Sequence, residues 1–149
     1  MNFKRIFCGV LFLLSVSFLY AQNSYFFHLP QQQNYEIFKR SLTDNGFDLL
    51  LNEGSTYLFS KSETNMTTEV VVVCPPTGWI HDVMYEYSGA GVKSSRAYKQ
   101  ICQAVIAHLG QPHMKTTKEM VWFFPAYSVV VAKDKKSVSL VWTKNDDKK

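Results

Sequence analysis

Two amphipathic helical segments, each followed by several strand-like segments, constrain the fold of this chain more than any other feature. In residues 31–46, Tyr35, Phe38 and Leu42 recur with helical spacing. In residues 94–109 the apolar stripe is more complete and comprises Tyr98, Ile101, Cys102, Val105 and Leu109. Because each stripe covers one side of its helix, both helices are predicted to pack by that side against a common core.

The residues at the helix ends support these two segments. Gly46 is expected to take a left-handed conformation that ends the first helix, with Phe47 folding back on its last turn. Ser94 or Ser95 is expected to cap the start of the second helix, and Gly110 follows its end.

The remaining segments are rich in β-branched and aromatic residues and are separated by turn residues, which favours strands. The predicted strands are residues 57–61, 68–74 and 79–87, then 119–124, 128–133 and 137–143. Residues 47–51 could add a short strand, and residues 25–27 could pair at an edge. The order predicts an α+β fold, with two helices on one face of a mainly antiparallel sheet of about six strands.

The same order occurs twice, which suggests a tandem αβββ repeat. A constant offset aligns four pairs of residues: Tyr35 with Tyr98, Phe38 with Ile101, Leu42 with Val105, and Phe59 with Trp122. Any two amphipathic helices followed by strands would align comparably, so the sequence leaves duplication open.

One stretch of the second half carries a resemblance to known proteins. Leu109-Gly110-Gln111-Pro112, then Trp122, then strands ending at Trp142, resemble one unit of small exported helix-plus-sheet modules. Those modules include the β-lactamase inhibitor proteins and the outer-membrane assembly lipoproteins. The resemblance implies a helix-plus-sheet fold and a tendency to bind, and it assigns no contact residue. The first half of the chain lacks the Gly-x-Pro.

The N-terminal residues have the layout of a cleavable secretory signal. Lys4 and Arg5 precede an apolar run over residues 6–20, and Ala21 offers a small residue for cleavage. We therefore expect a signal at 1–21, a single domain at 22–143 and a polar tail at 144–149, in a bacterial protein that is periplasmic or secreted. A retained anchor would need about 20 apolar residues, so no stable membrane anchor is expected after cleavage.

Loss of the signal changes the charge of the chain. The sequence has 16 basic and 12 acidic residues, and Lys4 and Arg5 leave with the signal, so 14 basic residues face 12 acidic ones. A net charge of +2 with no one-signed stripe of basic residues excludes nucleic acid as an expected partner.

Two of the three cysteines, Cys74 and Cys102, lie outside the signal. In an oxidising compartment they could form a disulfide, and they could equally be small buried hydrophobic residues. Sequence does not show whether their Cβ atoms meet, so both alternatives stay open.

No motif points to catalysis, a cofactor or a metal. The stretch at 88–95 has glycines and a Lys-Ser pair, but their spacing departs from a phosphate-binding loop. The four histidines lack metal-ligand spacing. His81 and Asp82 are adjacent in a predicted strand, so their side chains are expected on opposite faces, where they could not form a base and its orienting partner.

The apolar content of the strands is more informative. Residues 70–73, 120–124 and 129–132 are apolar on both faces, whereas two helices can cover only one face. The other face should keep an apolar patch, which is either covered by residues 25–27, used for self-association, or used as a docking surface. The aromatic residues predicted to carry binding, about half of them expected in the covered core, are Trp79, Tyr85, Tyr87, Trp122 and Trp142.

The sequence therefore predicts an exported, non-enzymatic binding or interaction module, inhibitor-like or an envelope accessory, whose partner the sequence does not identify. The apolar sheet face could contact a protein partner or a second copy of the chain. A small extracytoplasmic hydrolase and a structural homo-oligomer remain as alternatives.

Overall fold

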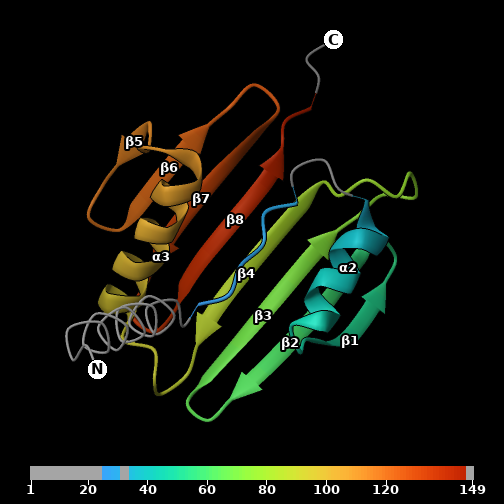
Figure 1. Ribbon diagram of the computed structural model, residues 1–149, viewed down its shortest axis with the longest axis horizontal. Coiled ribbons are helices and arrows are strands. Elements are labelled where there is room, and N and C mark those ends of the chain that lie inside the picture. The colour runs from blue at the N-terminus through green and yellow to red at the C-terminus, as the bar shows by residue number, and fades with distance from the viewer. Residues whose placement is uncertain (1–24, 31–33, 147–149) are drawn as a thin grey trace, which may run out of the picture.

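The computed structural model describes residues 25–30 and 34–146, which form one antiparallel sheet and two α-helices (Figure 1). The helices are α2 (Tyr35–Asp44) and α3 (Ser94–Leu109). The first four strands are β1 (Asp48–Glu53), β2 (Thr56–Glu63), β3 (Met66–Val73) and β4 (Asp82–Ser88). The last four are β5 (Met114–Lys115), β6 (Glu119–Phe123), β7 (Tyr127–Lys133) and β8 (Val138–Lys144).

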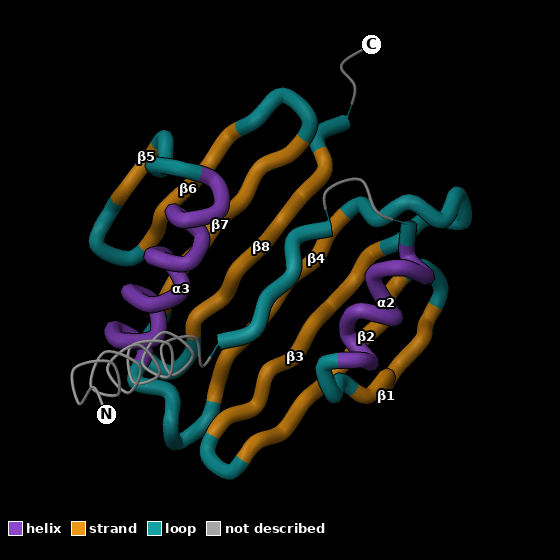
Figure 2. Tube along the Cα trace, viewed as in Figure 1, coloured by secondary structure: helices purple, strands orange, loops and turns teal. Residues whose placement is uncertain are grey.

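Both helices lie on the same face of the sheet, and the opposite face carries no helix among the described residues (Figure 2). The predicted α+β class is therefore confirmed. The expected number of strands was too low, because the sheet has eight, in the order β1-β2-β3-β4-β8-β7-β6-β5. The two edges are β1, which corresponds to the short strand that residues 47–51 could add, and β5, which was not predicted. β5 has only two residues and is too short to produce a periodic pattern.

The two halves of the chain have the same architecture. Each consists of one helix followed by four strands, so the unit is αββββ and not the predicted αβββ. The last strands of the two units, β4 and β8, pair antiparallel at the centre of the sheet. Phe59 on β2 and Trp122 on β6 lie on the second strand of their units and are both fully buried, as their alignment in the sequence suggests.

The end of α2 follows the predicted capping pattern. Phe47 N–H donates to the Leu42 carbonyl at 3.1 Å, and Gly46 N–H donates to the Thr43 carbonyl at 3.0 Å. Gly46 has a φ of 82°, which a residue with a Cβ seldom adopts. Phe47 is buried in the core, and its backbone bond to Leu42 sets the direction in which the chain enters β1.

The start of α3 differs from the prediction. The N-cap is Lys93, which makes no side-chain capping bond, and Ser94 is already helical. Gly91 N–H donates to the Asn65 carbonyl at 2.7 Å, which ties this turn to the loop between β2 and β3. Both serines predicted as caps, Ser94 and Ser95, therefore lie inside the first turn of the helix.

Residues 25–30 cross the helix side of β4 between α2 and α3 (Figure 1). The expectation that residues 25–27 pair at an edge of the sheet was therefore wrong. The Tyr85 hydroxyl donates to the His28 carbonyl at 2.9 Å and accepts from the His28 N–H at 3.0 Å. The Tyr87 hydroxyl donates to the Phe26 carbonyl at 2.7 Å. Two buried tyrosines on β4 thus anchor the segment, and it fills the space that the two helices leave over the central strands.

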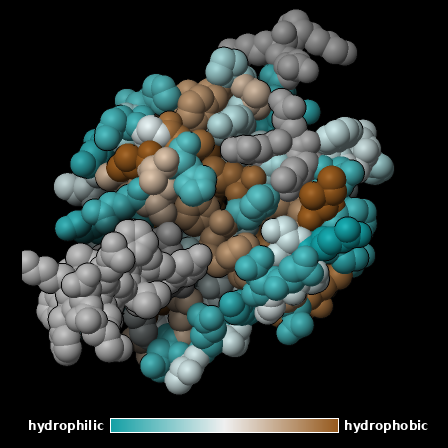
Figure 3. Space-filling view, in the orientation of Figure 1, coloured by the Kyte–Doolittle hydropathy of each residue, from teal (hydrophilic) through white to brown (hydrophobic). Residues whose placement is uncertain are grey.

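The core lies between the sheet and this layer of helices and extended chain. Strand register places one row of buried side chains across the sheet: Phe59, Val70, Tyr85, Leu140, Val131 and Met120. Against this row pack Phe38 and Leu42 of α2 and Ile101 and Val105 of α3. In Figure 3, apolar surface on the helix side lies between the hydrophilic outer surfaces of the helices.

Candidate functional site

The predicted aromatic residues divide between the core and the surface. Tyr85, Tyr87 and Trp122 are fully buried on the helix side of the sheet, where they support the fold. Trp122 Nε1–H donates to the Gly110 carbonyl at 2.9 Å. This bond joins the end of α3 to β6 and gives a structural reason for the spacing of these two residues in the sequence. Trp142 is 3% exposed, and Trp79, in the loop before β4, is 54% exposed.

The uncovered side of the sheet, which we call the open face, carries a continuous apolar row. Cross-strand partners share a face, so the register places these residues in one line from edge to edge. The row consists of Leu51, Leu58, Val71, Met84, Val141, Val130, Val121 and Met114. Most members are partly or fully exposed, whereas Val121 is buried. The apolar patch expected on this side is therefore present, and aliphatic residues and methionine form it.

Acidic residues flank the apolar row. The strand residues that point to the open face include Asp48, Glu53, Glu69, Asp82, Glu86 and Glu119. No strand residue described on this face is lysine or arginine. The strand lysines at 61, 115, 133 and 144 all point to the helix side. The full sequence has a net charge of +4, but the charged strand residues on the open face are acidic and most of those on the helix side are basic.

Two of these acids oppose each other directly. Glu69 on β3 and Glu86 on β4 are cross-strand partners. Like charges at directly opposite positions destabilise a sheet. Neither carboxylate makes an ion pair with a described residue. The open face therefore keeps an electrostatic repulsion that a neutral or basic residue would remove.

On the helix side, the ends of β7 and β8 and the loop before β4 enclose a cavity of about 390 Å³, which we call the Trp142 pocket. Its walls include Trp79, Ile80, Tyr127, Trp142, Lys144 and Asn145. The Tyr127 and Trp142 rings stack with their centroids 5.8 Å apart and an interplanar angle of 27°. The pocket therefore brings together two of the predicted aromatic residues, Trp79 and Trp142.

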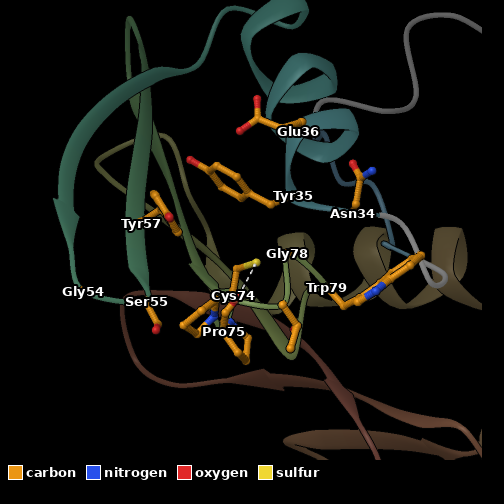
Figure 4. A pocket seen from close by; sticks show the side chains of 12 residues that line it. Asn34, Tyr35, Glu36, Gly54, Ser55, Tyr57, Cys74, Pro75, Gly78 and Trp79 are labelled. Atoms are coloured by element: carbon orange, nitrogen blue, oxygen red, sulfur yellow. Dashed lines mark hydrogen bonds between the residues drawn. The ribbon is translucent and has the colours of Figure 1, made fainter.

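A second cavity, of about 600 Å³, lies at the start of α2 (Figure 4). Tyr35 stacks on Tyr57 with the ring centroids 4.1 Å apart. Its buried hydroxyl has no hydrogen-bond partner among the described residues. Burial, with further effects from Tyr57 and Glu36, raises the Tyr35 pKa to about 12. The hydroxyl therefore stays protonated at neutral pH.

The two cysteines are free thiols in the structure and do not form the disulfide that the sequence left open. They belong to different halves of the fold. Cys74 lines the cavity at α2, where its thiol donates to the Pro75 carbonyl at 3.5 Å. Burial raises the pKa of Cys74, and Glu36 adds to this effect. Burial raises the Cys102 pKa to about 11. Neither environment generates a reactive thiolate.

The prediction for His81 was wrong. Its Nδ1 lies 2.7 Å from Asp82 Oδ2, and its Nε2 lies 3.2 Å from Asp146 Oδ1. β4 begins only at Asp82, so the alternation of side chains in a strand does not apply to this pair. Hydrogen bonds to Asp82 and then Asp146 raise the His81 pKa. Both ring nitrogens are occupied by carboxylates, so the group stabilises an imidazolium and leaves no nitrogen to accept a substrate proton.

Within residues 25–30 and 34–146, no cluster of histidine, cysteine and acidic residues could hold a metal ion. In the same part of the chain, no helix is both long enough and apolar enough to cross a bilayer. The predicted signal at 1–21 lies outside the described residues.

No family model, curated protein or solved structure matches this chain. The resemblance to small exported modules therefore stays a prediction. What the structure defines is a class of architecture, an α+β protein with two αββββ units sharing one antiparallel sheet.

Proposed function

We propose that this chain is a non-enzymatic binding module that docks a basic, apolar partner surface on the open face of its sheet. The observation that carries the proposal is the apolar row, which crosses all eight strands with acidic residues beside it. Burying such a row would supply affinity, and the acids would select a partner of positive charge.

The repulsion between Glu69 and Glu86 supports this assignment. A pair of like charges costs stability in the isolated domain. A partner that places lysine or arginine near both carboxylates would relieve this cost on binding. Local features that oppose folding stability often mark functional surfaces.

The distribution of charge also favours a different molecule over a second copy of this chain. Two open faces meeting each other would bring acidic residues against acidic residues, at a cost in free energy. The homo-oligomer alternative predicts a dimer through this face, whereas the proposal predicts a monomer at micromolar concentration. Size-exclusion chromatography with light scattering distinguishes these two outcomes.

The compartment in this proposal comes from the predicted signal. An exported module of this kind would meet basic segments of other exported or envelope proteins. The inhibitor-like and envelope-accessory roles both remain compatible with the open face.

The proposal can be tested with a defined probe. A fluorescent amphipathic peptide of leucine and lysine should bind the purified full chain saturably, and 1 M salt should weaken that binding. A matched peptide with glutamate in place of lysine should not bind. Val141→Lys, at the centre of the apolar row, should reduce affinity at least tenfold. Ile37→Lys, on the exposed side of α2, should leave affinity unchanged because Ile37 is 55% exposed and remote from this face.

A second variant separates loss of binding from loss of folding. Replacing Glu69 and Glu86 together by glutamine keeps side-chain shape and removes two charges, so the variant should fold and still bind the basic peptide more weakly. Equal affinity in the wild type, the Val141→Lys variant and the double glutamine variant would refute docking on the open face.

A further inference from the structure

The Trp142 pocket lies on the opposite side of the sheet from the proposed docking face and has different chemistry. We propose that it binds a small aromatic or aliphatic carboxylate, with the anion held by Lys144 and the Trp142 indole N–H. This inference is independent of the proposed function.

The shape and walls of the pocket fit an apolar body. Its volume of about 390 Å³ falls within the range of roughly 300–1,000 Å³ typical of small-molecule sites. Trp142 and Tyr127 form one stacked wall, and Trp79 and Ile80 contribute from the loop before β4. Trp79 is more than half exposed. Burying the remaining apolar surface of its indole would be favourable. A flat or aliphatic ligand in the pocket would provide that burial.

The polar signal is the Trp142 indole N–H. The side chain is 97% buried, and Nε1 has no acceptor among the described residues. Buried indole N–H groups usually find a partner, and leaving one unpaired costs about 1–3 kcal/mol. Trp122 provides an internal comparison, since it is also buried and its N–H donates to the Gly110 carbonyl at 2.9 Å. Of these two buried tryptophans, Trp142 lacks an acceptor for its N–H and also lines a cavity, whereas Trp122 does neither.

Lys144 defines the sign of the ligand. It is the one charged residue among those described in the pocket wall. It makes no ion pair with a described residue. Its backbone is fixed, because Lys144 N–H donates to the His81 carbonyl at 2.8 Å and Lys144 pairs with Tyr127 across the strands. Lys144 and Trp142 lie two residues apart on β8, so their side chains leave the same side of the sheet. The Trp142 N–H is closed off from solvent in this structure. A carboxylate held by Lys144 therefore reaches the N–H after a small shift of the indole or of a neighbouring wall residue.

The balance of charge favours a carboxylate over a phosphate. One lysine and one neutral N–H can compensate a single negative charge with two acceptor oxygens. A phosphate group carries close to two negative charges at neutral pH and would need further donors. The remaining pocket walls are largely aromatic and aliphatic and do not supply them. The same chemistry is available from a free small acid or from the C-terminal carboxylate of a peptide that ends in an apolar residue.

The experiment uses 3-phenylpropionate as the probe and its neutral isostere 3-phenylpropanamide as the control. Nitrogen-15 NMR of the full chain resolves the three tryptophan indole groups. The acid should shift the Trp142 N–H resonance saturably and leave the Trp122 resonance in place. The amide should bind at least tenfold more weakly, since it cannot pair with Lys144.

Two lysine variants complete the test. Lys144→Met should weaken binding of the acid at least tenfold, whereas Lys93→Met, at the start of α3 and outside this pocket, should not change it. A short peptide ending in phenylalanine should bind with a free C-terminus and not as its amide if the carboxylate is supplied by a protein. An unshifted Trp142 resonance with both the acid and the peptide, or unchanged affinity in Lys144→Met, would overturn the proposal.

Discussion

Reversing one charge on the open face should make this protein more stable. Glu69 and Glu86 oppose each other on adjacent strands, with Ser60 and Ser139 as their outer neighbours. Glu69→Lys therefore replaces a like-charge pair with an opposite-charge pair. Most surface substitutions change the free energy of unfolding by less than about 0.5 kcal/mol. A larger increase would therefore point to relief of the Glu69–Glu86 repulsion.

The expected magnitude follows from the cross-strand geometry. A directly opposed pair contributes about 0.2–1 kcal/mol in either direction. Removing the repulsion and adding an attraction together should raise the free energy of unfolding by about 0.5–2 kcal/mol. Glu69→Gln removes the repulsion only and should produce about half of that effect. Both values should decrease at 1 M salt, where the screening length falls to about 3 Å.

Urea denaturation followed by circular dichroism measures this change. With a denaturant slope of about 1–3 kcal/mol/M, each 1 kcal/mol of stabilisation raises the midpoint by about 0.3–1 M. Asp48→Lys is the matched control, since Asp48 lies on the same face opposite Ser60 and not opposite another acid. Its midpoint should barely move.

The same variant links stability to the proposed function. Glu69→Lys should weaken binding of the leucine–lysine peptide while it stabilises the fold. If Glu69→Lys leaves the midpoint unchanged or lowers it, the two carboxylates do not repel each other measurably, and the electrostatic argument for the open face fails.

Three further predictions concern other parts of the fold. The pKa of His81 is raised in the folded chain, so its contribution to stability is present below the unfolded-state pKa of about 6.5 and is lost as pH rises through the higher folded-state pKa. His81→Gln should therefore reduce the difference in the free energy of unfolding between pH 6 and pH 8, measured by urea titration. An unaltered difference would exclude His81 as its source. Cys74 and Cys102 should react with iodoacetamide slowly in the folded chain and fully in urea without reductant, whereas mass spectrometry showing no labelling in urea would indicate a disulfide. Gly89→Ala should destabilise the protein by about 1–3 kcal/mol, since φ is 117° and a Cβ would lie 2.7 Å from the Asn65 carbonyl oxygen; Gly54→Ala has open space around it and should cost less, and equal thermal shifts for the two would contradict the clash.

The local elements could be predicted well from sequence because their signals are local. Residues 94–109 form α3 with the predicted bounds, since a complete apolar stripe and a following Gly110 specify a helix and its end. The turn from α2 into β1 forms as expected around Gly46 and Phe47. β5 was missed because two residues carry no period.

The candidate sites could be predicted only in part. The sequence predicted an uncovered apolar face because several strands are apolar on both sides and two helices can cover only one side of a sheet. Which residues form that face required the register, since the predicted aromatic residues of the strands, such as Tyr85 and Trp122, all point to the helix side. The acidic character of the open face has the same origin, because strand parity is visible in the sequence only once each strand has been anchored to a face.

Sequence by itself determined the two helices, the order of the strands other than β5, and the presence of more apolar strand surface than two helices can cover. Periodicity and capping are properties of neighbouring residues, so they can be read without knowing the fold. Tertiary structure decided the pairing of β4 with β8, the path of residues 25–30 between the helices, and the meeting of Trp79 with Trp142. These contacts join residues that lie far apart in the chain. Their free energies depend on strand register and on the pairing of buried polar groups, and a local sequence pattern specifies neither.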